Sequence, residues 1–96
     1  MLKGLLRTTI LTSTLATLVP LTAQAADPAT CRDYATAAIR QVRGALSNPP
    51  CLPGLQGARW SADFQVHYNW CLTANYAAMG SERDARTAYL RSCTGH

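Results

Sequence analysis

Residues 59–79 read R-W-S-A-D-F-Q-V-H-Y-N-W-C-L-T-A-N-Y-A-A-M, and this stretch decides the fold. It holds both tryptophans, the only phenylalanine and one of the four cysteines. At about 100° per residue its apolar positions recur on one face, which is typical of an amphipathic helix. That face consists of Trp60, Phe64, His67, Cys71, Ala74 and Ala78. A second apolar strip beside it indicates a central helix that two neighbouring helices contact.

Two further helices are expected, one on each side of this stretch. The first runs from residue 29 or 30 to residue 45, because alanines and other small residues repeat at helical spacing there. The central helix begins near Ser61 and ends at residues 78–80, where Gly80 can supply a left-handed stop.

The last helix is expected to start at Ser81, a good N-cap, and to run to about Cys93. Glu82 and Arg86 on this helix have the spacing of a favourable i,i+4 ion pair. Between the first two helices, residues 47–58 contain three prolines and two glycines. That composition predicts a loop without a regular element, pinned to the domain by Cys51.

The N-terminus predicts export. Lys3 and Arg7 precede an apolar and threonine-rich run, and Ala23-Gln24-Ala25 is the small-x-small pattern that signal peptidase recognises. We therefore interpret residues 1–25 as a cleaved signal peptide, with cleavage after Ala25 or Ala26, and residues 26–96 as one domain. The apolar run is too short to span a bilayer, so no stable membrane insertion is expected after cleavage.

The composition of the remaining seventy or so residues argues against a nucleic-acid binder. Seven arginines face five acidic residues, which gives a net charge of +2, and the arginines are spread out without a basic run. A chain this short buries too little apolar surface to fold easily without cross-links. Four cysteines in an exported chain therefore predict two disulfides in the periplasm or outside the cell.

The sequence allows three ways to pair the four cysteines. If the three helices run up, down and up, Cys31 and Cys71 lie toward one end of the bundle. Cys51 and Cys93 then lie at the other end. This geometry favours the pairs Cys31–Cys71 and Cys51–Cys93.

His67 offers two alternatives to a purely structural domain. As the base of a small enzyme it would need an accessible cleft and a nearby nucleophile, but no catalytic arrangement is evident. As a metal ligand it could combine with three other residues in a tetrahedral zinc site, namely Cys71, Cys93 and His96. An oxidising compartment favours disulfides over that site, and the favoured interpretation of His67 is a core histidine bonded to a backbone or side-chain oxygen. We predict no resident metal and no cofactor.

Aromatic residues surround the central helix on all sides, so some of them are expected to be exposed. A surface of this kind beside an arginine could bind a protein, a peptide or a glycan. The candidate residues are Arg59, Trp60, Trp70 and Tyr76.

Three short motifs resemble those of a group of small secreted bacterial proteins of unknown function. The motifs are C-x-x-Y-A at residues 31–35, G-x-R-W at residues 57–60 and H-x-x-W-C at residues 67–71. The resemblance covers most of residues 26–96 and supports a secreted, helical, two-disulfide domain. It implies no activity and no site residues.

These observations together predict a small all-α, three-helix domain that follows a cleaved signal peptide and is cross-linked by two disulfides. Its most favoured role is that of a non-enzymatic binding or accessory module in the periplasm or outside the cell.

Overall fold

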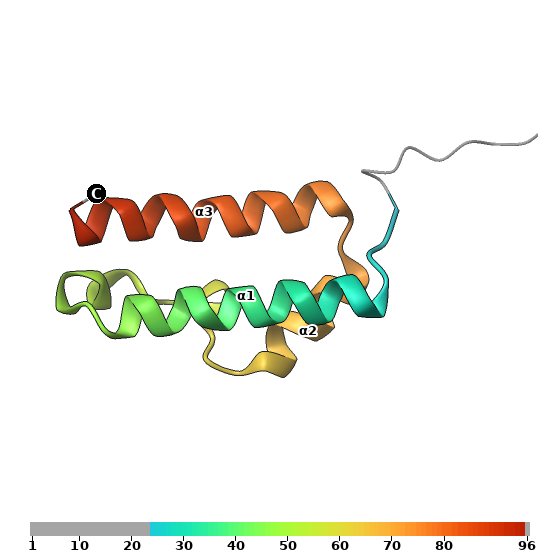
Figure 1. Cartoon of the computed structure of the whole chain (residues 1–96), viewed down its shortest axis with the longest axis horizontal. Helices are drawn as coiled ribbons and strands as arrows, with labels where there is room; N and C mark the ends of the chain where they lie inside the picture. The colour runs from blue at the N-terminus through green and yellow to red at the C-terminus, as the bar shows by residue number, and fades with distance from the viewer. Residues whose placement is uncertain (1–23, 96) are drawn as a thin grey trace, which may run out of the picture.

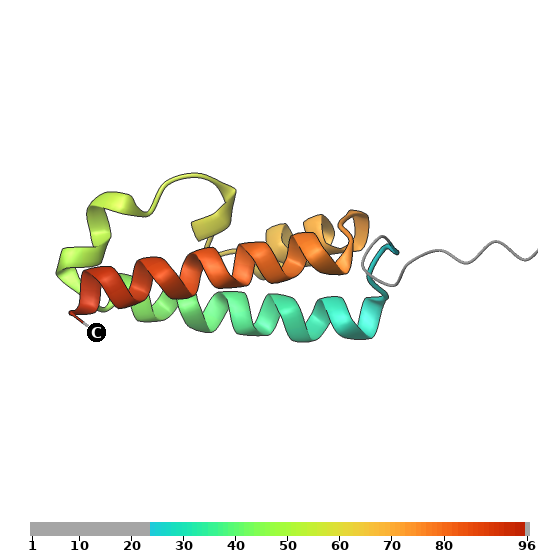
Figure 2. The same ribbon diagram turned by 90° about the horizontal axis from the view of Figure 1, so that it is seen from above.

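The computed structural model describes residues 24–95, so the expected signal peptide lies almost entirely outside the described residues. Three α-helices follow one another: α1 (Pro28–Leu46), α2 (Phe64–Thr73) and α3 (Tyr76–Thr94). α1 and α3 run side by side in the same direction, and the chain between them returns through α2 (Figures 1 and 2). The predicted all-α, three-helix domain is confirmed. No helix in this part of the chain is long and apolar enough to cross a membrane.

Local sequence encodes both the start of α1 and its buried face. Asp27 caps the helix, because the Thr30 amide donates to its Oδ1 at 2.7 Å, and Pro28 occupies the first turn. The small residues that repeat at helical spacing form the most deeply buried strip of α1, which is at most 1% exposed and consists of Cys31, Ala35, Ala38, Val42 and Ala45. Small side chains along it let neighbouring elements approach closely.

The proline-rich segment after α1 is more regular than the sequence predicted. It forms two 3₁₀ helices, η3 (Pro49–Gly54) and η4 (Ala58–Trp60). Prolines fit the first turn of η3 because the amides there have no partner within the helix. The expected pin is present, since Cys51 is fully buried and its carbonyl accepts a hydrogen bond from the Tyr89 hydroxyl at 2.8 Å.

The central helix is shorter than predicted at both ends. α2 begins at Phe64, with Asp63 as its N-cap, and ends at Thr73. α3 then begins at Tyr76 and continues through Gly80 without interruption. The prediction that Gly80 separates these two helices was therefore wrong.

Asn75 causes the actual break. Its side chain accepts a hydrogen bond from the Ala78 amide at 2.8 Å and caps α3. The apolar period continues across this position, which made residues 59–79 resemble one helix. Gly80 has no left-handed conformation, since the glycines with positive φ in the described chain are Gly57 and Gly95.

Each disulfide lies in a separate apolar cluster. Cys31–Cys71 joins the start of α1 to the end of α2, and Cys51–Cys93 joins η3 to the end of α3. Both pairings agree with the favoured sequence geometry. In the chain-entropy model, each cross-link closes a loop of about forty residues and stabilises the fold by about 4 kcal/mol.

A polar layer lies between the two clusters. The first cluster surrounds Cys31–Cys71 and includes Met79, whereas the second surrounds Cys51 and includes Val42 and Trp60. Between them, side chains of α1 and α3 are joined by hydrogen bonds. The polar layer consists of Gln41, Arg86, Thr87 and the hydroxyl group of Tyr34, whose ring belongs to the first cluster.

The described chain begins with a short segment that docks on the α2–α3 connection. Ala25 forms an isolated antiparallel bridge with Asn75, and the Ala26 amide donates to the Ala74 carbonyl at 3.1 Å. Ala26 is buried in the first apolar cluster, whereas Gln24 and Ala25 are exposed.

Replacing Gly80 with alanine should raise the free energy of unfolding by about 0.5–1 kcal/mol. Alanine is the better helix former, and its Cβ would meet only the flexible Arg83 side chain, at 3.4 Å.

Asn75→Ala should lower the free energy of unfolding by about 1 kcal/mol through loss of the cap. Urea unfolding of the oxidised protein measures both, and a destabilised Gly80→Ala variant would favour a helix break at Gly80.

Candidate functional site

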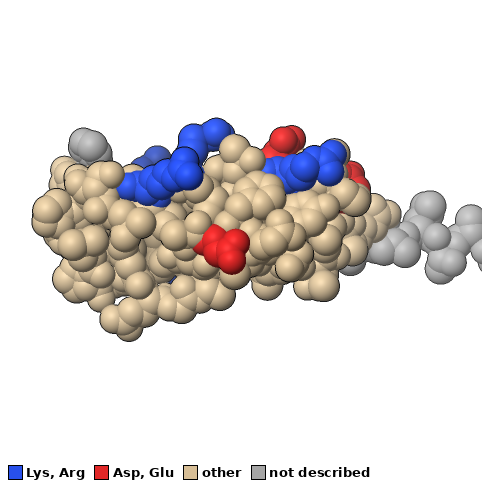
Figure 3. Space-filling view, turned by 90° about the horizontal axis from the view of Figure 1, so that it is seen from below, with Lys and Arg blue, Asp and Glu red and all other residues tan. Residues whose placement is uncertain are grey.

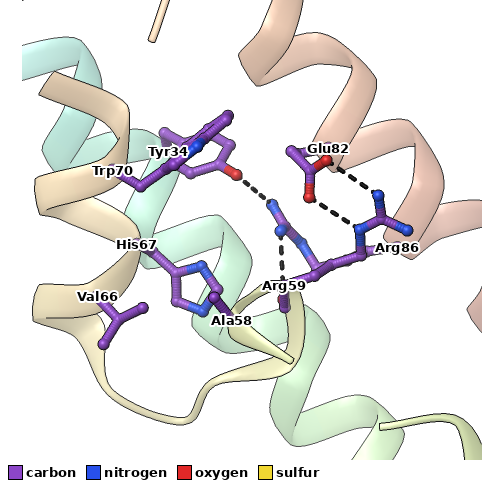
Figure 4. Close-up of a pocket in the computed structure, with 8 residues that line it drawn as sticks. All are labelled: Tyr34, Ala58, Arg59, Val66, His67, Trp70, Glu82 and Arg86. Carbon is purple, nitrogen blue, oxygen red and sulfur yellow. Dashed lines mark hydrogen bonds and ion pairs between the residues drawn. The ribbon is translucent and has the colours of Figure 1, made fainter. Parts of the chain in front are cut away.

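A small cleft lies where four elements of the chain meet. It has a volume of about 60 Å³, and Figure 4 shows the residues that surround it. α1 contributes Tyr34, η4 contributes Ala58 and Arg59, and α3 contributes Glu82 and Arg86. α2 contributes Val66, His67 and Trp70, which share one helix face because they are one, three and four positions apart.

The rim of the cleft is apolar and accessible. Val66 and Trp70 are each 37% exposed, and they are two of the four large hydrophobic side chains that the described chain exposes. The Trp70 ring packs against the Tyr34 ring with the centroids 5.6 Å apart, which fixes its orientation. α2 carries no Asp, Glu, Lys or Arg, and the face seen from below shows charged side chains mainly along one edge (Figure 3).

The four residues of the predicted binding surface do not all come together. Arg59 and Trp70 line the cleft, as expected for a shared surface. Trp60 is only 9% exposed and packs edge-on against Tyr89, so its predicted place on the surface was wrong. Tyr76 lies outside the cleft lining, and its hydroxyl is 3.5 Å from Asp27 Oδ2 at the start of α1.

Arg59 and Glu82 form a bidentate ion pair across the cleft. Arg59 Nε and Nη2 donate to the two carboxylate oxygens at 2.8 and 3.0 Å. These hydrogen bonds lower the pKa of Glu82 and raise the pKa of Arg59, and the charge of Arg86 lowers the Glu82 pKa further. The i,i+4 ion pair between Glu82 and Arg86 that the sequence predicted is not formed, because η4 brings a better-placed guanidinium to Glu82.

Arg86 is a cleft residue that the sequence pattern did not assign to the candidate site. Its side chain is only 1% exposed and joins three elements through hydrogen bonds. Nε donates to Gln41 Oε1 at 2.7 Å, Nη2 to the Tyr34 hydroxyl at 3.0 Å and Nη1 to the Arg59 carbonyl at 3.4 Å. Its guanidinium carbon also lies 5.2 Å from the centroid of the Tyr34 ring.

Burying this cation destabilises the folded state. Moving a charge out of water costs several kcal/mol of solvation free energy unless a counter-ion replaces the solvent. All three acceptors are neutral oxygens. A signal for this role was present in the sequence, since Arg86 shares a helix face with Tyr89, Leu90 and Cys93. An arginine on the apolar face of a helix is a candidate for burial.

His67 forms part of the cleft wall and is buried, with 3% of its surface exposed. Its Nε2 lies 2.7 Å from the Ser61 carbonyl oxygen, which can only accept, so Nε2 carries the proton. The prediction of a core histidine bonded to a backbone oxygen is confirmed. The enzyme hypothesis required an accessible His67 beside a nucleophile, and no serine, threonine or cysteine lines this cleft.

Neither cysteine of the alternative zinc site is free to bind a metal as a thiolate. Cys71 is bonded to Cys31 and Cys93 to Cys51, so the two proposed cysteine ligands belong to different disulfides. His96 lies outside the described residues. Within residues 24–95, no three His, Cys, Asp or Glu side chains are grouped as metal ligands would be.

No protein-family model matches the sequence, and neither a curated protein nor a solved structure matches it. The resemblance to small secreted bacterial proteins therefore stays a prediction. The geometry of the cleft is the basis for a functional proposal.

The lowered pKa of Glu82 predicts a pH dependence of stability. A carboxylate whose pKa is below its ordinary value of 4.5 stabilises the folded state at neutral pH. That contribution is lost as the pH falls through the folded pKa, because the unfolded chain binds the proton first. The stability advantage of the wild type over Glu82→Gln should be less than about 1 kcal/mol at pH 7 and should shrink steadily below pH 4.5.

Urea unfolding at several pH values between 7 and 2 tests this expectation. Asp84→Asn is the matched control, since Asp84 is on the same helix and is 78% exposed. A wild-type advantage over Glu82→Gln that is the same at pH 7 and pH 2 would contradict the assignment of the ion pair.

Proposed function

We propose that this protein is an exported, non-enzymatic binding or accessory module. Its binding surface comprises the cleft and the Val66–Trp70 rim. The observation that carries the proposal is the exposure of Trp70 at the edge of a cleft that contains a buried guanidinium. Tryptophan and arginine are the residues most enriched at the energetic centres of interfaces.

The frame around the cleft supports a role in binding. The two disulfides fix the ends of the helices from which the lining residues project. A rigid site loses little conformational entropy when a partner binds, so even a small surface can give useful affinity. A protein, a peptide or a glycan could provide the apolar or aromatic-stacking contacts that the rim favours.

Export is supported by the chemistry of the cysteines. Disulfides form and persist in oxidising compartments, and the described chain has no free cysteine. Together with the signal-peptide pattern at residues 1–25, this favours the periplasm or the extracellular space.

The intact mass of the protein recovered from the periplasm should correspond to residues 26–96 with two disulfides. Alkylation without reduction should add no mass, because all four cysteines are bonded. Alkylation after reduction should add four labels and serves as the control. A full-length mass, or free thiols before reduction, would contradict export through a cleaved leader into an oxidising compartment.

Trp70→Ala should weaken partner binding at least about tenfold, because the substitution removes the largest exposed side chain of the rim. The measurement is a pull-down from periplasmic extract, followed by titration of the recovered partner. Leu52→Ala is the matched control, since Leu52 is 48% exposed and lies outside the cleft. Equal recovery of the partner by both variants, or no partner with the wild type, would argue against the proposed surface.

A further inference from the structure

The charges that line the cleft do not balance. Two guanidinium groups, those of Arg59 and Arg86, face one carboxylate, that of Glu82. Glu82 is already held by the bidentate contact with Arg59. The cleft therefore keeps an excess of one positive charge, and the buried cation Arg86 is the one without a bound carboxylate.

No other acidic residue in the described chain neutralises Arg86. The ion pairs there are Arg59–Glu82 and Arg83–Asp84. Asp33 lines a neighbouring hollow of about 210 Å³ that Arg86 also borders, but it is exposed and makes no ion pair with Arg86. An anion that entered the cleft would meet a cation that water hardly screens.

Arg86 has hydrogen-bonding capacity left for such an anion. A guanidinium has five N–H groups, and three of them donate to Gln41, Tyr34 and the Arg59 carbonyl. Two N–H groups remain. Arginine commonly binds a carboxylate through two parallel hydrogen bonds, so a planar carboxylate is the anion best suited to this group.

The size of the cleft and its rim limit what can carry the carboxylate. A volume of about 60 Å³ is enough for a small group such as a carboxylate. The apolar side chains of Val66 and Trp70 at the rim are placed to contact the rest of the ligand. At the C-terminus of a peptide, the carboxylate and the last side chain branch from the same carbon, which suits a positive floor beside an apolar rim.

We propose that the cleft binds the C-terminal carboxylate of a peptide whose last residue is apolar. Arg86 pairs with the carboxylate, and Trp70 and Val66 contact the last side chain. The inference rests on the proposed binding function and gives its site a ligand chemistry.

The test uses the oxidised, folded protein and a minimal probe, N-acetyl-leucine, which carries a free carboxylate next to a branched apolar group. Heteronuclear NMR follows the indole N–H of Trp70, while the buried Trp60 outside the cleft provides an internal control. N-acetyl-leucine should shift the Trp70 signal saturably and leave Trp60 unchanged. N-acetyl-leucinamide, which has no charge, should bind at least tenfold more weakly.

Three variants separate the contributions. Glu82→Gln should bind N-acetyl-leucine at least threefold more tightly, because the variant removes the negative charge that repels the anion and occupies Arg59, while Arg86 is kept. Arg86→Lys should bind at least tenfold more weakly, since lysine retains the charge but loses the bidentate geometry. Arg83→Gln, an exposed arginine on the same helix, should leave the affinity unchanged.

Equal shifts with the acid and the amide, or no change in affinity for Glu82→Gln, would overturn the inference. The affinity of Glu82→Gln still tests the inference if Arg86→Lys does not fold. Stronger binding of an aspartate side chain, presented as N-acetyl-aspartate α-amide, would reject a C-terminus as the ligand. If Trp70→Ala weakens binding of the recovered partner but N-acetyl-leucine does not bind, the proposed binding surface still stands and only the carboxylate inference fails.

Discussion

The cross-linking of a small chain at two separate points is the constraint on which the rest of the structure depends. Each disulfide lies in its own apolar cluster, and a chain this short buries too little apolar surface to fold easily without cross-links. With the ends fixed in this way, the middle of the bundle can hold polar groups. That is where the chain buries an arginine and a tyrosine beside a half-buried glutamine, and it is where the cleft opens.

The cleft therefore depends on the separation of the apolar residues into two clusters. A continuous apolar core would have filled the space between α1 and α3 with aliphatic side chains. The polar layer brings hydrogen-bond donors to the protein interior, and the short α2 places a tryptophan and a histidine beside them. No single element forms the site, since α1, η4, α2 and α3 each supply part of its lining.

The sequence was informative where local chemistry acts alone. The stripe of small residues on α1, the two cysteine pairs and the structural bond of His67 were all predictable. The break at Asn75 was missed because an asparagine cap interrupts the backbone without interrupting the apolar period. The ion pair of Glu82 was also misassigned, since its partner Arg59 is distant in sequence and only the return path through η4 brings it near.

Burial of Arg86 was the least predictable feature, because it depends on oxygens from two other elements that satisfy its N–H groups. Its position on an apolar helix face was the only indication. Trp60 was misjudged for the opposite reason: it was included in the candidate surface, but it packs in a T-shaped contact against the partly buried Tyr89 and is itself buried in the second apolar cluster.

The docking of Ala25 and Ala26 on the α2–α3 connection also bears on the order of events during export. A protease must hold the residues around the bond that it cuts in an accessible, unpaired conformation. In the folded domain, Ala25 is bridged to Asn75 and Ala26 is buried. If the leader is removed after Ala25, as the proposed export requires, the cut must come before Ala25 and Ala26 dock on this connection or while they are locally undocked. The new α-ammonium group of Ala26 can then donate to the Ala74 carbonyl in place of the amide, so that maturation leaves the first residue as part of the core.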